Sequence, residues 1–326
     1  MTSLVESPSV TSRRAFLQGA GALALGATFV GSLAAAAPVP APDRKRVLRA
    51  AHLTDVHIGP GNHSEAGFRA SIRHAQGQTD PAEFILIGGD CVSDSLGTPK
   101  DQVLRQWEVW NRVFSSEVRV PHASCLGNHD VLGWARRGDV AAPRDPDYGK
   151  VLALRELGLK ERYQSFDRAG WHFVVLDSMQ IDYANGNGYV ARLDDDQFAW
   201  LEADLAQTPT AVPICVLSHI PIMSAAAFLD GDLAGSGSWL VPGAWMHVDA
   251  RKIQKLFLRH PNVKACLSGH LHMVDDVTYL GVRYLCNGAV CGAWWNGSHY
   301  EFGPAYAMFD FFSDGTVERT MHAYEA

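Results

Sequence analysis

Short runs of apolar residues recur along the chain, and most of them are followed by a cluster that contains Gly, Asp, Asn or His. Near-continuous apolar runs are typical of strands that are buried on both faces of a sheet. We therefore predict strands over Val47–Thr54, Phe84–Ile87, Val118–Leu126, His172–Leu176, Val212–Leu217, Val263–Leu267, Val282–Cys286, Tyr306–Phe312 and Thr316–His322.

Three segments between these runs carry apolar residues at the spacing of one helix face: Pro99–Phe114, Asp194–Leu205 and Asp249–Arg259. The second begins with acidic residues, which suit the first turn of a helix. Strands that alternate with helices predict the α/β fold class. The last three predicted strands have no helix between them, so we expect part of the sheet to be antiparallel.

Two long stretches follow neither pattern. Leu132–Lys150 is rich in Gly, Pro, Arg and Asp, and Met223–Trp245 is rich in Gly, Ala and Ser with interspersed aromatic residues. Loops of this length in a compact domain are usually binding segments or lids. The sequence shows no internal repeat, so we predict a single catalytic domain over residues 47–326.

The N-terminal region has a different character. Arg13 and Arg14 precede a Gly/Ala-rich apolar run that ends near Leu33 and is followed by small residues. This pattern resembles a twin-arginine signal peptide over residues 1–37, followed by a Pro-rich linker over 38–46. The apolar run is shorter than the ~20 residues of a membrane span. We expect the twin-arginine export machinery to carry the protein to the periplasm or the exterior, with no stable membrane span after cleavage; a retained anchor is the alternative.

Composition narrows the functional classes. The chain has 326 residues with a net charge of −7, and this acidic balance argues against nucleic acid as a stable partner. Its six cysteines form no CxxC pair, and most lie within or beside apolar runs, so we predict that they are buried packing residues. A periplasmic redox protein is disfavoured, because the sequence has neither a CxxC motif nor a dinucleotide-binding fingerprint.

Five predicted strands run into clusters of potential metal ligands: Asp55-Val56-His57, Gly88-Gly89-Asp90, Gly127-Asn128-His129-Asp130, Ser218-His219 and Gly269-His270-Leu271-His272. Ligands of α/β sheets lie outside the carboxyl ends of strands, so we expect these clusters to converge. The candidate donors are Asp55, His57, Asp90, Asn128, His219, His270 and His272. Nitrogen and oxygen donors without thiolate favour Mn, Fe or Zn over Ca. Seven donors are too many for one tetrahedral site and suit two divalent or mixed-valence ions that share a carboxylate.

The ordered motifs DxH, GGD, GNHD, SH and GHLH resemble those of the calcineurin-like metallophosphoesterase family, in particular its bacterial cyclic-nucleotide and glycerophosphodiester phosphodiesterases. The resemblance covers about Val47 to Phe311 and implies a four-layer αββα sandwich of two mixed sheets. It places one metal on Asp55, His57, Asp90 and His272, and the second on Asp90, Asn128, His219 and His270. It also implies that His129 faces the substrate and that Asp130 hydrogen-bonds to His129 and orients it.

Such a site implies hydrolysis of a small-molecule phosphate ester by a hydroxide that bridges the two ions. His129 would protonate the leaving group. A phosphodiester is the favoured substrate. A phosphomonoesterase or pyrophosphatase is the alternative, with Arg136 and Arg137 as additional cations at the substrate. A catalytically inactive metal-binding module is a further alternative, which the retention of His129 disfavours.

Adjacent tryptophans occur in a polar, Gly-rich segment near the end of the motif series. In an extended segment, adjacent side chains point opposite ways, so one of Trp294 and Trp295 is expected to face solvent or a pocket. We expect Trp294 or Trp295 to contact the leaving group of the ester.

Overall fold

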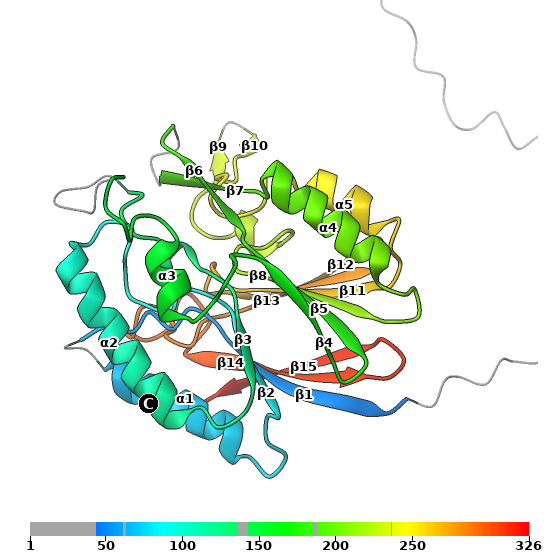
Figure 1. The fold of residues 1–326 in the computed structure, drawn as a ribbon, viewed down its shortest axis with the longest axis horizontal. Helices are drawn as coiled ribbons and strands as arrows, with labels where there is room; N and C mark the ends of the chain where they lie inside the picture. The colour runs from blue at the N-terminus through cyan, green and yellow to red at the C-terminus, as the bar shows by residue number, and fades with distance from the viewer. Residues whose placement is uncertain (1–43, 61–62, 136–142, 185–187, 236, 326) are drawn as a thin grey trace, which may run out of the picture. The chain divides into compact units, whose positions relative to one another are not determined.

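A computed structural model describes residues 44–60, 63–135, 143–184, 188–235 and 237–325, and two large β-sheets form its centre (Figure 1). One sheet consists of β1 (Arg46–Leu53), β2 (Phe84–Ile87), β3 (His122–Ser124), β14 (Ala305–Phe312) and β15 (Val317–Ala323), in the order β15-β14-β1-β2-β3. The other consists of β4 (Gln164–Arg168), β5 (Trp171–Leu176), β8 (Ile214–Ser218), β11 (Val263–Ser268), β12 (Val274–Tyr279) and β13 (Val282–Asn287), in the order β12-β13-β11-β8-β5-β4.

Both sheets are mixed. In the five-stranded sheet, β1, β2 and β3 are parallel, whereas β14 is antiparallel to β1 and to β15. In the six-stranded sheet, β5, β8, β11 and β13 are parallel, and β4 and β12 are antiparallel edge strands. The carboxyl ends of the parallel strands therefore share one edge within each sheet.

Helices cover the outer faces of the two sheets. The helices are α1 (Ser64–Gly77), α2 (Lys100–Glu117), α3 (Val151–Glu156), α4 (Asp195–Gln207) and α5 (Ala250–Phe257). Residues of α1, α2 and α3 pack with the outward side chains of β1 and β2, whereas α4 and α5 pack on β5, β8 and β11. A separate apolar layer lies between the sheets. The predicted four-layer αββα sandwich is confirmed.

The alternation of side chains along β1 shows how the layers are built. Ala50 contributes to the layer between the sheets, whereas its neighbour Ala51 packs toward the helices. On the helix side, the ring of Trp110 stacks on Phe68 with centroids 4.8 Å apart, and Trp110 is 1% exposed. Burial of each such side chain stabilises the fold by about 1.5–3 kcal/mol. These contacts fix α1 and α2 against the sheet whose strand ends carry the ligand clusters.

Short elements make up the rest: the 3-10 helices η1 (Asn128–Asp130) and η2 (Ala226–Phe228), and the strand pairs β6 (Met179–Asp182) with β7 (Gly188–Ala191) and β9 (Ala234–Gly235) with β10 (Ser238–Trp239). Among the residues that the structure describes, no helix combines the length and apolar character needed to cross a bilayer. All six cysteines are buried and unpaired, as predicted. The predicted signal peptide, residues 38–43 of the linker, and Arg136 and Arg137 lie outside the described residues.

The expectation that part of the sheet is antiparallel is confirmed. The last three predicted strands are divided between the two sheets: β13 belongs to the six-stranded sheet, where it is parallel to β11 and antiparallel to β12. Only β14 and β15 extend the five-stranded sheet in antiparallel order. The chain between β13 and β14 therefore passes from one sheet to the other, and Trp294 and Trp295 lie in this connection.

Candidate metal centre

The predicted ligand residues lie in the loops that follow β1, β2, β3, β8 and β11, and the structure brings all of them together. Backbone hydrogen bonds join these loops to one another. His57 N–H donates to the carbonyl of Asp90 (2.9 Å), and Gly269 N–H donates to the carbonyl of His219 (3.0 Å). The strand ends of both sheets therefore meet in one buried cluster, as the sequence predicted.

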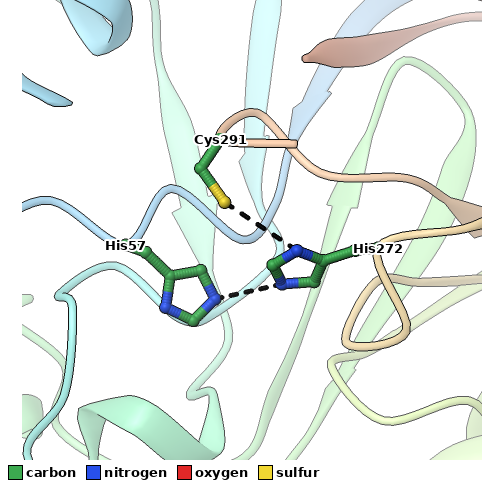
Figure 2. A group of neighbouring side chains, drawn as sticks. All are labelled: His57, His272 and Cys291. Atoms are coloured by element: carbon green, nitrogen blue, oxygen red, sulfur yellow. Dashed lines mark hydrogen bonds between the residues drawn. The ribbon is translucent and has the colours of Figure 1, made fainter. Parts of the chain in front are cut away.

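A first group of ligand atoms surrounds the imidazoles of His57 and His272, whose Nε2 atoms are 3.1 Å apart (Figure 2). Asp55 Oδ1 lies 3.4 Å from Nε2 of His272 and 4.0 Å from Nε2 of His57. Asp90 Oδ2 lies 3.5 Å from Nε2 of His57. These four side chains are the set that the family resemblance assigned to one metal.

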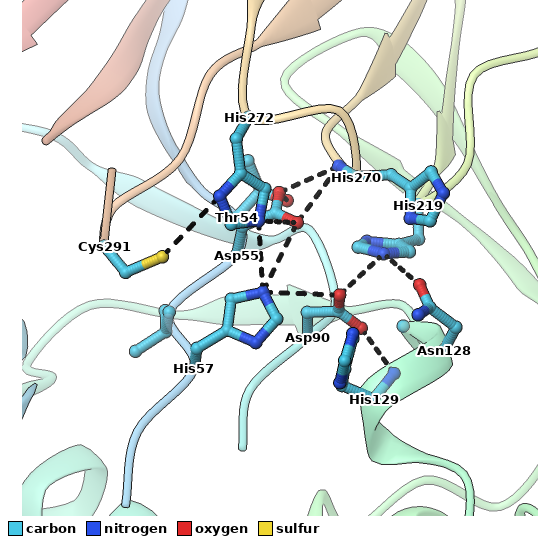
Figure 3. A network of polar contacts seen from close by, with 12 residues as sticks. Thr54, Asp55, His57, Asp90, Asn128, His129, His219, His270, His272 and Cys291 are labelled. Atoms are coloured by element: carbon cyan, nitrogen blue, oxygen red, sulfur yellow. Dashed lines mark hydrogen bonds and ion pairs between the residues drawn. The ribbon is translucent and has the colours of Figure 1, made fainter. Parts of the chain in front are cut away.

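A second group lies on the other side of Asp90 (Figure 3). Nε2 of His219 is 3.2 Å from Asp90 Oδ2 and 3.1 Å from Asn128 Oδ1. A ring nitrogen of His270 lies within 4.8 Å of the ligand atoms of both Asp90 and His219. Asp90 Oδ2 therefore adjoins both groups, which is the place a shared carboxylate requires.

The histidine tautomers favour a cation at Nε2. Nδ1 of His219 lies 2.7 Å from the carbonyl oxygen of Gly88, and Nδ1 of His57 lies 3.3 Å from that of Ser93. Nδ1 of His272 likewise meets a backbone carbonyl, so each Nδ1 is placed to donate. Burial opposes charge on His272, but Asp55 raises its pKa, so without a metal this ring carries a proton where the two Nε2 atoms lie 3.1 Å apart; a shared cation can take the place of that proton.

The pKa shifts of the histidines in the cluster also indicate a site for metal cations. Burial lowers the pKa of His57 and of His270 to about 3, which keeps both imidazoles neutral. Burial opposes charge on His219 as well, but Asp90 raises its pKa to about 9. Without a metal, protons on the imidazoles compensate the buried carboxylates. Metal ions would take their place and release those protons. The residues present therefore fit two transition-metal ions.

The backbone conformations of the ligand loops allow these loops to approach one another closely. Five ligand residues have left-handed backbone conformations, which are uncommon outside glycine: Asp55 (φ 55°), His57 (45°), Asp90 (52°), His270 (71°) and His272 (56°). Such conformations cluster at functional sites, where the surrounding structure enforces them. Gly127 is also required, because a Cβ there would lie 2.0 Å from the backbone nitrogen of Asp90.

The sequence of this chain is similar to those of known phosphoesterases. Residues 48–274 match the protein family described as "Calcineurin-like phosphoesterase". The chain belongs to the calcineurin-like phosphoesterase family. A 3',5'-cyclic-nucleotide phosphodiesterase of Nostoc sp. is 24% identical over 289 residues, which cover 84% of this chain and 91% of the relative. The 3',5'-cyclic adenosine monophosphate phosphodiesterase of Escherichia coli is 24% identical over 300 residues, which cover 87% of this chain and 92% of the relative.

A solved structure, that of a dimetal phosphatase from Danio rerio, has a TM-score of 0.57 at 13% identity, and the match covers 86% of this chain and 100% of that one. At this identity the likeness shows the shared fold. Family membership establishes the chain as a metal-dependent phosphoester hydrolase.

His129 of this phosphoesterase is held differently from the expectation. Its backbone N–H donates to Asp90 Oδ1 (2.8 Å), and Nδ1 of its ring lies 3.2 Å from Asp94 Oδ1. Asp130 was expected to orient the ring, but its carboxylate accepts backbone N–H groups of Cys91 and Gly127, both at 2.8 Å. Asp130 thus fixes the loops, and Asp94 takes the position beside the His129 ring. Burial works against the positive charge of His129, but Asp90 and Asp94 raise its pKa.

Cys291 is a neighbour of the centre that the sequence did not indicate. Its Sγ lies 3.9 Å from Nδ1 of His272, the nitrogen that faces the backbone rather than His57 (Figure 2). Burial raises the pKa of the Cys291 thiol despite the adjacent histidine. Its Sγ also lies within 4.8 Å of ring nitrogens of His57 and His272, so Cys291 adjoins the first group of ligands.

The two tryptophans of the phosphoesterase have different environments. Both lie in a turn with left-handed backbone conformations, so the extended segment assumed from the sequence does not form. Trp295 is half-buried, and its Nε1–H lies 2.9 Å from the carbonyl of Val56 and 3.2 Å from that of His57. Trp294 is 44% exposed and stacks on the ring of His272 with centroids 4.4 Å apart. Trp294 is therefore the tryptophan at the surface of the centre.

Proposed function

We propose that this calcineurin-like phosphoesterase hydrolyses a small-molecule phosphodiester at a centre that binds two transition-metal ions, Mn, Fe or Zn. The observation that carries this proposal is the position of Asp90 Oδ2, which lies 3.5 Å from Nε2 of His57 and 3.2 Å from Nε2 of His219. When bound, two such cations activate water and neutralise charge on phosphate oxygens.

The side chains of the centre have two roles, metal binding and proton donation. Asp55, His57, Asp90 and His272 would hold one ion, and Asp90, Asn128, His219 and His270 the other. His129 is not in either set. It lines a pocket of about 300 Å³ together with Asp94, Leu96, Gly97, Asn128, Ala135 and Tyr189. From this pocket, the imidazolium of His129 can give its proton to the departing oxygen, with Asp94 holding the ring.

The pocket also bears on the choice of ester. Among its described lining residues there is no Lys or Arg, which supports a singly charged diester over a dianionic monoester. Arg136 and Arg137, which would favour a monoester, lie outside the described residues. Since the relatives are cyclic-nucleotide phosphodiesterases, we propose a 3',5'-cyclic nucleotide as the diester to test first.

The test uses one metal-depleted preparation of the protein, reconstituted in turn with Mn, Fe and Zn. Turnover is compared on 3',5'-cyclic AMP, bis(p-nitrophenyl) phosphate and p-nitrophenyl phosphate. We expect no turnover without metal and higher kcat/KM on the diesters. Faster turnover of p-nitrophenyl phosphate would make the protein a phosphomonoesterase. Two bound ions with no turnover on any ester would make it a metal-binding module without activity.

The location of the activity is a separate proposal. We propose that residues 1–37 act as a twin-arginine signal and that hydrolysis takes place outside the cytoplasm. The support is the pair Arg13 and Arg14 before an apolar run. A protein exported in the folded state can receive its metals before it leaves the cytoplasm.

A further inference from the structure

An exposed aromatic surface adjoins the candidate metal centre. The indole of Trp294 stacks on His272 at an interplanar angle of 27° and lies 5.3 Å, centroid to centroid, from the ring of His57. Both histidines belong to the first group of ligands. A large apolar ring that remains 44% exposed beside a polar centre leaves apolar surface in contact with water. A ligand that covers this ring would remove that surface from water.

Two further rings continue this surface. His299 lies edge-on to Trp294, with centroids 6.2 Å apart, and Tyr300 lies 4.6 Å from His299 and is 52% exposed. Nε2 of His299 is 3.6 Å from Asp230 Oδ1, so the surface is tied to the segment that follows β8. We call Trp294, His299 and Tyr300 the aromatic shelf.

The backbone under the shelf is anchored. Trp295 packs so closely on α1 that a Cβ on Gly67 would lie 2.0 Å from its ring. The backbone N–H of Cys291 donates to the carbonyl of Asp55 (3.1 Å). The turn that carries Trp294 is therefore fixed to the loops that carry the ligands, and the shelf keeps its place relative to the centre.

A phosphodiester has two substituents on phosphorus. The structure offers one place for a substituent in the pocket beside His129 and another at the exposed ring of Trp294. The departing oxygen must lie within reach of His129, which lines the pocket beside Asn128. Trp294 is not among the residues that line that pocket. The ring of His57 lies between the two places, 4.8 Å from the ring of His129 and 5.3 Å from that of Trp294, and Trp294 also stacks on His272. Planar rings stack on exposed indoles irrespective of their hydrogen-bonding pattern.

We propose that the aromatic shelf binds the planar ring of the group that remains bonded to phosphorus after hydrolysis. In an acyclic diester this group is the retained substituent, and in a 3',5'-cyclic nucleotide it is the nucleoside, which stays attached through one ester oxygen and carries the base. This proposal rests on the proposed phosphodiesterase function. It defines the substrate class as diesters whose retained group carries an aryl or heteroaryl ring. Trp294 is then a determinant of specificity and takes no part in metal binding or proton transfer.

Two substrates with the same leaving group test this assignment. Bis(p-nitrophenyl) phosphate retains a ring after p-nitrophenolate departs, whereas methyl p-nitrophenyl phosphate retains a methyl group. Trp294→Ala should raise KM for the first by about 5- to 100-fold and leave KM for the second within about twofold. Trp294→Phe should restore most of the lost affinity. Metal content of the variants, measured by mass spectrometry, should equal that of the wild type.

Tyr279→Ala is the matched control, because Tyr279 is also 44% exposed but lies on the edge strand β12; its KM values should not change. Equal KM increases for both substrates in Trp294→Ala would place the shelf at the leaving group and overturn the assignment. Unchanged KM for both, or loss of metal, would show that Trp294 only packs on His272 and would also overturn it. Failure of the wild type to hydrolyse both of these diesters and 3',5'-cyclic AMP would instead refute the proposed function.

Discussion

Gly127→Ala isolates the contact between the loop that carries Asn128 and the loop that carries Asp90. A Cβ at residue 127 would lie 2.0 Å from the backbone nitrogen of Asp90 and 2.1 Å from its Oδ1. Ordinary contacts begin near 3.4 Å, so the two loops must separate by about 1.4 Å. Asp90 is the shared carboxylate, and a displacement of about 1 Å can cost about 10²-fold in rate.

We therefore expect kcat/KM of Gly127→Ala on bis(p-nitrophenyl) phosphate to fall by about 10²-fold or more, together with bound metal. Overpacking in a core typically costs about 1–3 kcal/mol, and a clash with backbone atoms, as here, costs more. Circular dichroism must therefore show that the variant is folded before its turnover is compared. Gly77→Ala is the matched control, because a Cβ at the end of α1 meets no atom within 4 Å. A folded Gly127→Ala protein with wild-type metal content and turnover would refute the argument.

Three other predictions concern separate parts of the chain. His129→Ala should lower kcat by about 10²–10⁴-fold on an alkyl ester and much less on a nitrophenyl ester, which departs without a proton; equal losses on both would mean that His129 only positions phosphate. Asp204 lies 2.9 Å from Nε2 of His172 and raises the pKa of His172. The ion pair between protonated His172 and Asp204 therefore stabilises the folded state fully below about pH 6.5, and this stabilisation is lost as the pH rises through the raised pKa of His172. The difference in unfolding free energy between the wild type and His172→Gln, measured in urea, should therefore shrink toward alkaline pH rather than grow. Arg13→Lys with Arg14→Lys should leave active protein with an uncleaved N-terminus in the cytoplasm, as fractionation would show; normal amounts of mature protein outside would contradict the export signal.

The sequence was most informative where strands are buried on both faces. The run Phe84–Ile87 coincides with β2, and the predicted Val263–Leu267 differs from β11 by one residue. Elements without such runs were missed. The edge strand β12 has no fully buried position. The inner face of α1 mixes Phe68, Ile72 and Ala75 with Ser64, Gly67 and Ser71, which weakens its apolar periodicity. Small residues on that face permit the close packing of Trp295 on Gly67.

The convergence of the ligand motifs followed from their places after strands, because parallel strands direct their carboxyl ends to one edge. Contacts within the loops could not be predicted in this way. Asp94 belongs to no motif, and only the fold brings its carboxylate to His129 in place of Asp130. The difference between Trp294 and Trp295 likewise depends on left-handed backbone angles in a turn, which a period-two pattern cannot indicate.

The shared position of Asp90 is tested most directly by the metal content of Asp90→Asn, measured by mass spectrometry beside the wild type after identical reconstitution. Asparagine keeps the shape of the side chain but removes the charge that lies between His57 and His219. We predict two ions per chain in the wild type, weakened binding of both ions in the variant, and a greater loss of turnover than any other single ligand substitution causes. An Asp90→Asn protein that retains two ions and near-normal turnover would contradict the two-metal centre as assigned.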